Sequence, residues 1–126
     1  MYYYLIAGEA SGDMHGARLI SQIIQHDPEA KFRLWGGDKM SDAANTSVVK
    51  HYKNYDHMGI AEVLKHARTR LKNIAFCKQD IAKHKPDALI FIDFPGFNLK
   101  IAPFAKSIGI KTFFYISPTI WAWKEG

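Results

Sequence analysis

The sequence predicts an α/β fold, a Rossmann-like parallel sheet with helices on both faces. Short apolar runs at residues 2–7 and 88–92 are typical of strands that are buried on both faces. Longer segments, at residues 14–26 and from residue 60 onward, carry apolar residues at helical spacing. Because such strands and helices alternate along the chain, they are expected to form βαβ units around one parallel sheet.

Local signals set the expected ends of these elements. Gly8 ends the first strand, and Asp27-Pro28 ends the first helix, because the residue before a proline disfavours helical backbone. Lys85-Pro86 ends the long helical stretch. The remaining expected elements are a strand at 31–35, a short strand at 48–49, a helix at 97–107 and a strand at 111–116.

The composition is that of one folded domain, with 48% hydrophobic and 23% charged residues in 126. No apolar run is long enough to cross a bilayer, and residues 1–6 lack the features of a signal peptide, so we expect a cytosolic protein. Cys77 is the single cysteine, which excludes an internal disulfide, and we expect it to be buried and inert.

The net charge of +5 is concentrated in one segment, since residues 50–85 hold nine basic and three acidic residues. Such a segment attracts phosphate groups, whether on nucleic acid, on anionic lipid or on a small molecule. The charge alone does not choose among these partners. The histidines show no metal-ligand spacing, so no metal site is predicted.

Three segments carry candidate chemistry. The loop at residues 8–13 joins a strand to a helix, where backbone N–H groups can bind a phosphate or a sugar; alternatively, Ser11 or Asp13 only caps the helix. Asp93 follows the strongest predicted strand and is a candidate general base, or else a helix cap. Near residue 120, Trp121 and Trp123 are candidates for sugar stacking or for ordinary core packing.

Five segments, taken together and in this order, resemble the lipid-A-disaccharide synthase family. They are AGEASGDMHGA at residues 7–17, GG-x-x-M at 36–40, MGIAEVL at 58–64, IDFPGFNLKIA at 92–102 and YISPTIWAW at 115–123. The resemblance implies a GT-B glycosyltransferase, of which residues 1–126 form the N-terminal, acceptor-side Rossmann-like domain, without the C-terminal nucleotide-sugar domain. It also implies a peripheral protein on the cytoplasmic face of the inner membrane.

The implied reaction is inverting and needs no metal or cofactor. A 2,3-diacylglucosamine unit passes from its UDP derivative to the 6-hydroxyl of 2,3-diacylglucosamine 1-phosphate. Asp93 is the expected base, with Glu9 as its rival. The expected substrate-binding residues are Gly8, Ser11, Gly12, Asp13, Asn98, Ser117 and Trp121. A basic, amphipathic stretch is expected to contact acyl chains or the membrane through Ile60, Val63, Leu64, Lys65, Arg68, Arg70 and Leu71.

Two other classes of function are compatible with the residues. In one, the chain is a stand-alone module that binds an anionic ligand or a membrane surface through residues 50–85 and catalyses nothing. In the other, it binds nucleic acid, although the sequence holds no single-strand or groove-reading motif, and we rank this class last. The sequence leaves homo-oligomer formation open.

Overall fold

The computed structural model describes residues 1–54, 67–92 and 95–115. Within these residues, five strands form one parallel sheet in the order β3-β2-β1-β4-β5. Their bounds are β1 (Tyr2–Ala7), β2 (Lys31–Gly36), β3 (Lys50–His51), β4 (Ala88–Ile92) and β5 (Lys111–Tyr115). The predicted Rossmann-like parallel sheet is therefore confirmed.

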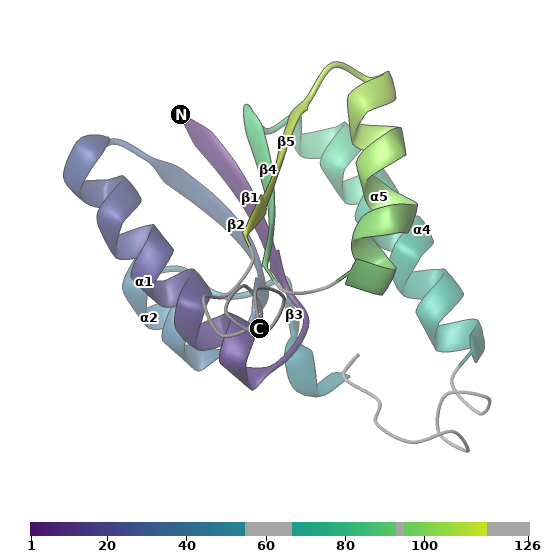
Figure 1. The fold of residues 1–126 in the computed structure, drawn as a ribbon, viewed down its shortest axis with the longest axis horizontal. Helices are drawn as coiled ribbons and strands as arrows, with labels where there is room; N and C mark the ends of the chain where they lie inside the picture. The colour runs from purple at the N-terminus through teal and green to yellow at the C-terminus, as the bar shows by residue number, and fades with distance from the viewer. Residues whose placement is uncertain (55–66, 93–94, 116–126) are drawn as a thin grey trace, which may run out of the picture.

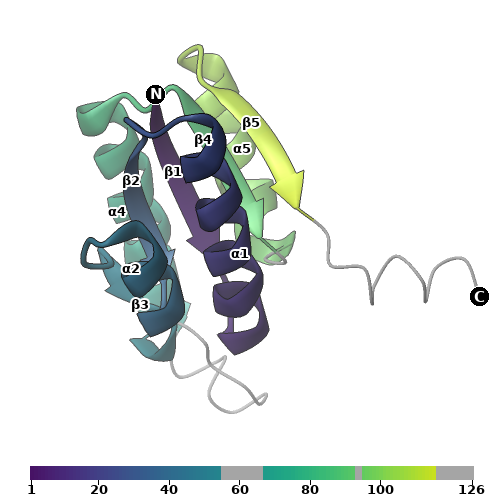
Figure 2. The same ribbon diagram turned by 90° about the vertical axis from the view of Figure 1, so that its left-hand side faces the viewer.

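The helices form two layers on opposite faces of this sheet. They are α1 (Ala10–His26), α2 (Asp38–Ala44), α4 (Ala67–His84) and α5 (Pro95–Ser107), with a short 3₁₀ helix, η1 (Tyr52–Asn54). Helices α1 and α2 cover one face, and α4 and α5 cover the other (Figures 1 and 2). After β3 the chain crosses to the opposite side of β1 to form β4, so the order of the strands reverses between β1 and β4.

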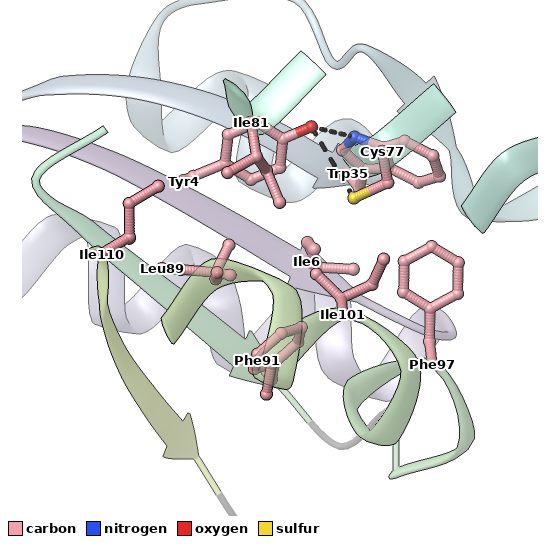
Figure 3. Close-up of a cluster of buried hydrophobic side chains, with 12 residues drawn as sticks. Tyr4, Ile6, Trp35, Cys77, Ile81, Leu89, Phe91, Phe97, Ile101 and Ile110 are labelled. Carbon is pink, nitrogen blue, oxygen red and sulfur yellow. Dashed lines mark hydrogen bonds between the residues drawn. The ribbon is translucent and has the colours of Figure 1, made fainter. Parts of the chain in front are cut away.

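Alternation along the strands supplies a core to each layer. Tyr4 and Ile6 of β1 pack with α4 and α5, whereas Leu5 and Ala7 pack with α1 and α2. The first core also contains Trp35 from β2 (Figure 3). Side chains of this size each contribute about 1.5–3 kcal/mol when they are fully buried. The two cores hold the carboxyl ends of β1 and β4 in fixed positions.

The structure corrects several expected boundaries. Helix α1 begins at Ala10, four residues earlier than expected, and therefore includes Gly12 and Gly16. Helix α2 was not predicted. The third strand lies at Lys50–His51 and not at 48–49, because its register places Lys50 opposite Trp35 of β2.

Helix α5 also departs from expectation, since it begins at Pro95 and continues through Pro103. Proline is well suited to the first position of a helix, where its missing N–H would have no intrahelical partner. The exposed Pro103 removes one helical hydrogen bond without ending the helix.

Candidate functional site

The carboxyl ends of β1, β4 and β5 lie side by side. Ala7 at the end of β1 is opposite Ile92 at the end of β4, and Ile92 is opposite Tyr115 at the end of β5. The loop after β1 therefore leaves the sheet beside the point where the chain leaves β4. Open parallel sheets bind ligands at this kind of crevice, where the strand order reverses.

Glu9 and Ser11 lie in this loop and in the first turn of α1. Glu9 is the exposed N-cap of α1, in extended conformation, and its side chain makes no capping hydrogen bond. The hydroxyl of Ser11 donates instead to Oε1 of Glu9 over 3.0 Å. Helix N-termini carry N–H groups that lack intrahelical partners, so this end of α1 is suited to an oxygen ligand.

Gly8 and Gly12 allow close backbone packing where β1 leads into α1. Gly8 is buried directly after β1. A Cβ at Gly12 would lie 3.2 Å from the Cβ of Ala7 and 3.3 Å from the carbonyl oxygen of Ile92. The absence of a side chain therefore lets α1 lie close to the ends of both strands. Gly12 has a packing role here that the prediction of substrate binding did not include.

Asp13 is 4% exposed and caps a neighbouring helix. Its Oδ1 accepts hydrogen bonds from the backbone N–H groups of Gly37 (2.8 Å) and Met40 (3.0 Å), and its Oδ2 accepts one from Lys39 (3.1 Å). These donors belong to the start of α2. The carboxylate is thus held inside the protein. The sequence had suggested that Asp13 caps its own helix, α1, whereas in the structure it caps α2.

The residues that support Asp13 were not predicted from the sequence. A Cβ at Gly37 would lie 2.7 Å from Oδ2 of Asp13 and 2.5 Å from Cε2 of Tyr52. A Cβ at Gly16 would lie 2.7 Å from the sulfur of Met40. The available signal was the pair Gly36-Gly37, which entered above only as part of a segment that resembles the family.

A second buried polar group lies under α4, on the opposite face of the sheet. Asp80 accepts two hydrogen bonds from the guanidinium of Arg33, of 2.5 and 2.6 Å, and one of 2.7 Å from the hydroxyl of Tyr4. The indole of Trp35 donates to that hydroxyl over 2.7 Å (Figure 3). This network joins α4 to the centre of the sheet.

The electrostatics of this network follow from its burial and its partners. Burial alone would raise the pKa of Asp80, but the hydrogen bonds from Arg33 and Tyr4 outweigh it and leave the pKa below its usual value. Burial also raises the pKa of Tyr4 and brings that of the Cys77 thiol to about 12. Cys77 is fully buried, as expected, and a thiol with such a pKa is a poor nucleophile.

Several predicted site residues lie outside the described residues. These are Ile60, Val63, Leu64, Lys65, Asp93, Ser117 and Trp121. Arg68 and Arg70 lie in α4 and Asn98 in α5, but the structure describes only their backbone. Leu71 in α4 is 66% exposed.

Neither a metal site nor a membrane span is found in the part of the chain that the structure describes. There, no group of three His, Cys, Asp or Glu side chains is placed to hold a metal ion. No helix among these residues is both long enough and apolar enough to cross a bilayer.

Comparison with solved structures supports the fold. The described architecture is similar to UDP-GlcNAc 2-epimerase from Neisseria meningitidis, solved with bound UDP-GlcNAc, with a TM-score of 0.58. The likeness covers 90% of this chain and 32% of the epimerase, at 12% sequence identity. At that identity the likeness concerns the fold alone.

Sequence comparison identifies the family. The chain is 41% identical over 122 residues to the lipid-A-disaccharide synthase of Geobacter metallireducens and 40% identical over 125 residues to that of Coxiella burnetii. Each match covers 97% of this chain and 32% of the relative, so the chain spans about a third of the length of these enzymes. The family model for lipid-A-disaccharide synthetase matches residues 3–126, and the chain therefore belongs to this family.

Proposed function

We propose that the full-length protein is an inverting glycosyltransferase of lipid A biosynthesis. It transfers 2,3-diacylglucosamine from its UDP derivative to the 6-hydroxyl of 2,3-diacylglucosamine 1-phosphate and releases UDP. The family match over residues 3–126 is the observation that carries this proposal. The stand-alone binding module is less favoured, because the named relatives at about 40% identity are synthases of about three times this length.

Residues 1–126 form the acceptor-side domain of a two-domain GT-B enzyme in this proposal. The crevice between β1 and β4 receives the acceptor sugar, and a second domain supplies the site for the UDP-sugar. The uncapped N-terminus of α1 and the polar pair Glu9 and Ser11 support this location, because both offer partners for sugar or phosphate oxygens. Gly12 and Asp13 support the crevice from beneath, by holding α1 on the strands and α2 on α1.

A transfer assay tests the proposal. The full-length protein is expected to form the β-1,6-linked disaccharide 1-phosphate from the two substrates without added metal. Residues 1–126 alone are expected to form none and to bind UDP weakly or not at all, because half of the cleft is missing. Robust product formation by residues 1–126 would contradict the division of roles, and an inactive full-length protein would contradict the function.

We also propose that the α4/α5 layer contacts the membrane on the cytoplasmic face. Leu71 near the start of α4 is 66% exposed, and Leu99 near the start of α5 is 76% exposed. Each is followed by an exposed lysine, Lys72 or Lys100. Both helices start at the carboxyl edge of the sheet (Figure 1). These four residues come early in α4 and α5, so they lie toward the side of the domain where the acceptor is proposed to bind. Basic surfaces with exposed apolar side chains bind anionic lipid interfaces.

Vesicle co-sedimentation tests the membrane contact. Full-length protein carrying Lys72→Glu and Lys100→Glu is expected to bind vesicles with anionic lipid about 30-fold more weakly, since each basic residue near such a surface contributes about 1 kcal/mol. The matched control reverses Arg18, an exposed residue of α1 on the opposite face of the sheet, and Lys31, an exposed residue at the amino end of β2. If binding depends neither on the content of anionic lipid nor on the charge at Lys72 and Lys100, these residues form an ordinary solvated surface and the proposed membrane contact is wrong.

A further inference from the structure

His15 lies at the same edge of the sheet as the proposed acceptor site. It follows Ser11 by one turn of α1, so the two side chains share a face of the helix. The imidazole ring packs at a tilt against the ring of Tyr115, with centroids 5.9 Å apart. Tyr115 ends β5 and is opposite Ile92, which is itself opposite Ala7. The ring of His15 is therefore held beside the row of residues from which the loops of the crevice begin.

One nitrogen of this ring has no hydrogen-bond partner among the residues that the structure describes. Nδ1 of His15 is buried. Among the buried side-chain nitrogen and oxygen atoms of the described residues, it is the atom that makes no hydrogen bond. Native proteins seldom leave such groups unpaired, and those they do leave unpaired often belong to functional sites. A buried N–H without an acceptor is rarer than an acceptor without a donor. The tautomer that fits therefore has its proton on Nε2.

We propose that His15 is a substrate-contacting residue, whose Nε2–H donates a hydrogen bond to an oxygen of a phosphorylated glucosamine bound in the crevice. The inference rests on the proposed function and adds a specificity residue to it. The contact with Tyr115 fixes the ring, and the buried Nδ1 fixes the tautomer, so the donor is oriented before the ligand arrives. Both substrates of the proposed reaction are phosphorylated glucosamine derivatives, and separate titrations of each identify the one that His15 contacts.

The test compares two substitutions, one that keeps the aromatic ring without the hydrogen-bond donor and one that keeps a donor without the ring. In His15→Phe the ring and its contact with Tyr115 remain but both nitrogens are lost. In His15→Gln the aromatic contact is lost, while the amide nitrogen lies close to the former position of Nε2. Steady-state kinetics of the full-length protein are measured with each substrate varied in turn, together with thermal unfolding.

A donor role predicts opposite effects of the two substitutions. His15→Phe is expected to raise the KM for one substrate about 10- to 100-fold, the range for one lost hydrogen bond to a charged group, with a smaller change in kcat. Its unfolding temperature is expected to be unchanged or higher, because a buried unpaired nitrogen is removed. His15→Gln is expected to keep that KM within about threefold of the wild-type value.

Other outcomes overturn the proposal. If His15→Phe keeps both KM values while His15→Gln unfolds at a lower temperature, the residue serves only to pack against Tyr115. If the wild-type protein shows no transfer, the proposed function fails instead. In that case, calorimetric binding of glucosamine 1-phosphate to the wild-type and His15→Phe proteins still decides the role of His15: equal affinities, or no binding by either, overturn it.

Discussion

Replacing Asp93 with asparagine in the full-length protein is expected to lower kcat by about 10²–10⁴-fold, the usual contribution of a positioned general base. The acceptor 6-hydroxyl is a weak nucleophile until its proton is removed. Residue 93 comes directly after Ile92, which is opposite Ala7 in the sheet, so it follows β4 where the crevice begins. This is the place where open parallel sheets present catalytic groups.

Glu9→Gln provides the matched comparison, because Glu9 is the rival candidate base and lies in the loop after β1. Its Oε1 already accepts the hydroxyl of Ser11, and its side chain is exposed. We therefore expect a smaller fall in kcat than for Asp93→Asn. Circular dichroism and thermal unfolding of both variants control for folding. A folded Asp93→Asn enzyme with near-normal turnover at saturating acceptor would refute the assignment of Asp93 as the base.

Replacing Asp80 with alanine is expected to have the largest effect on stability, a loss of about 3–5 kcal/mol in the free energy of unfolding. The substitution leaves the guanidinium of Arg33 and the hydroxyl of Tyr4 without their shared acceptor, under a helix that packs on the sheet. Denaturant unfolding measures the change. Asp42→Ala, at an exposed position of α2, is the control and is expected to change stability by less than about 0.5 kcal/mol. Equal effects of the two substitutions would show that the network contributes little.

Asp80 also makes stability depend on pH in a defined direction. Its pKa in the folded protein lies below the usual value of an aspartate side chain. A carboxylate of this kind stabilises the fold above its unfolded pKa, and the contribution is lost as the pH falls through the lower, folded pKa. Acid unfolding of the wild-type protein is therefore expected to steepen below about pH 4, and Asp80→Asn to flatten that part of the curve. If the Asp80→Asn protein loses stability below about pH 4 as steeply as the wild-type protein, this account is wrong.

The sequence predicted the elements whose signals are local. The strand at Ala88–Ile92 is a continuous apolar run, and the structure confirms its bounds. The early start of α1 was missed because Gly12 and Gly16 are poor helix formers. Their small size is needed for contact with Ala7 and Met40, so packing outweighs the local propensity. Helix α2 was missed because seven residues are too few to establish a helical period.

The partners of buried polar groups could not be predicted in the same way. Asp13 binds backbone groups more than twenty residues along the chain, and Asp80 binds Arg33 and Tyr4 from two different strands. Such pairs depend on strand order and register, which hydrophobic patterns specify only coarsely. For the same reason, the sequence pointed to the loop at 8–13 but not to the capping of α2 by Asp13 or to the contact between His15 and Tyr115.

A structure of the full-length protein with bound 2,3-diacylglucosamine 1-phosphate tests the central proposal most directly. We expect the acceptor sugar in the crevice between β1 and β4, with its 6-hydroxyl within hydrogen-bond reach of Asp93 and its oxygens close to Ser11 and the start of α1. An acceptor bound wholly to the second domain, with this crevice left to UDP or to solvent, would contradict the assignment of residues 1–126 as the acceptor-side domain.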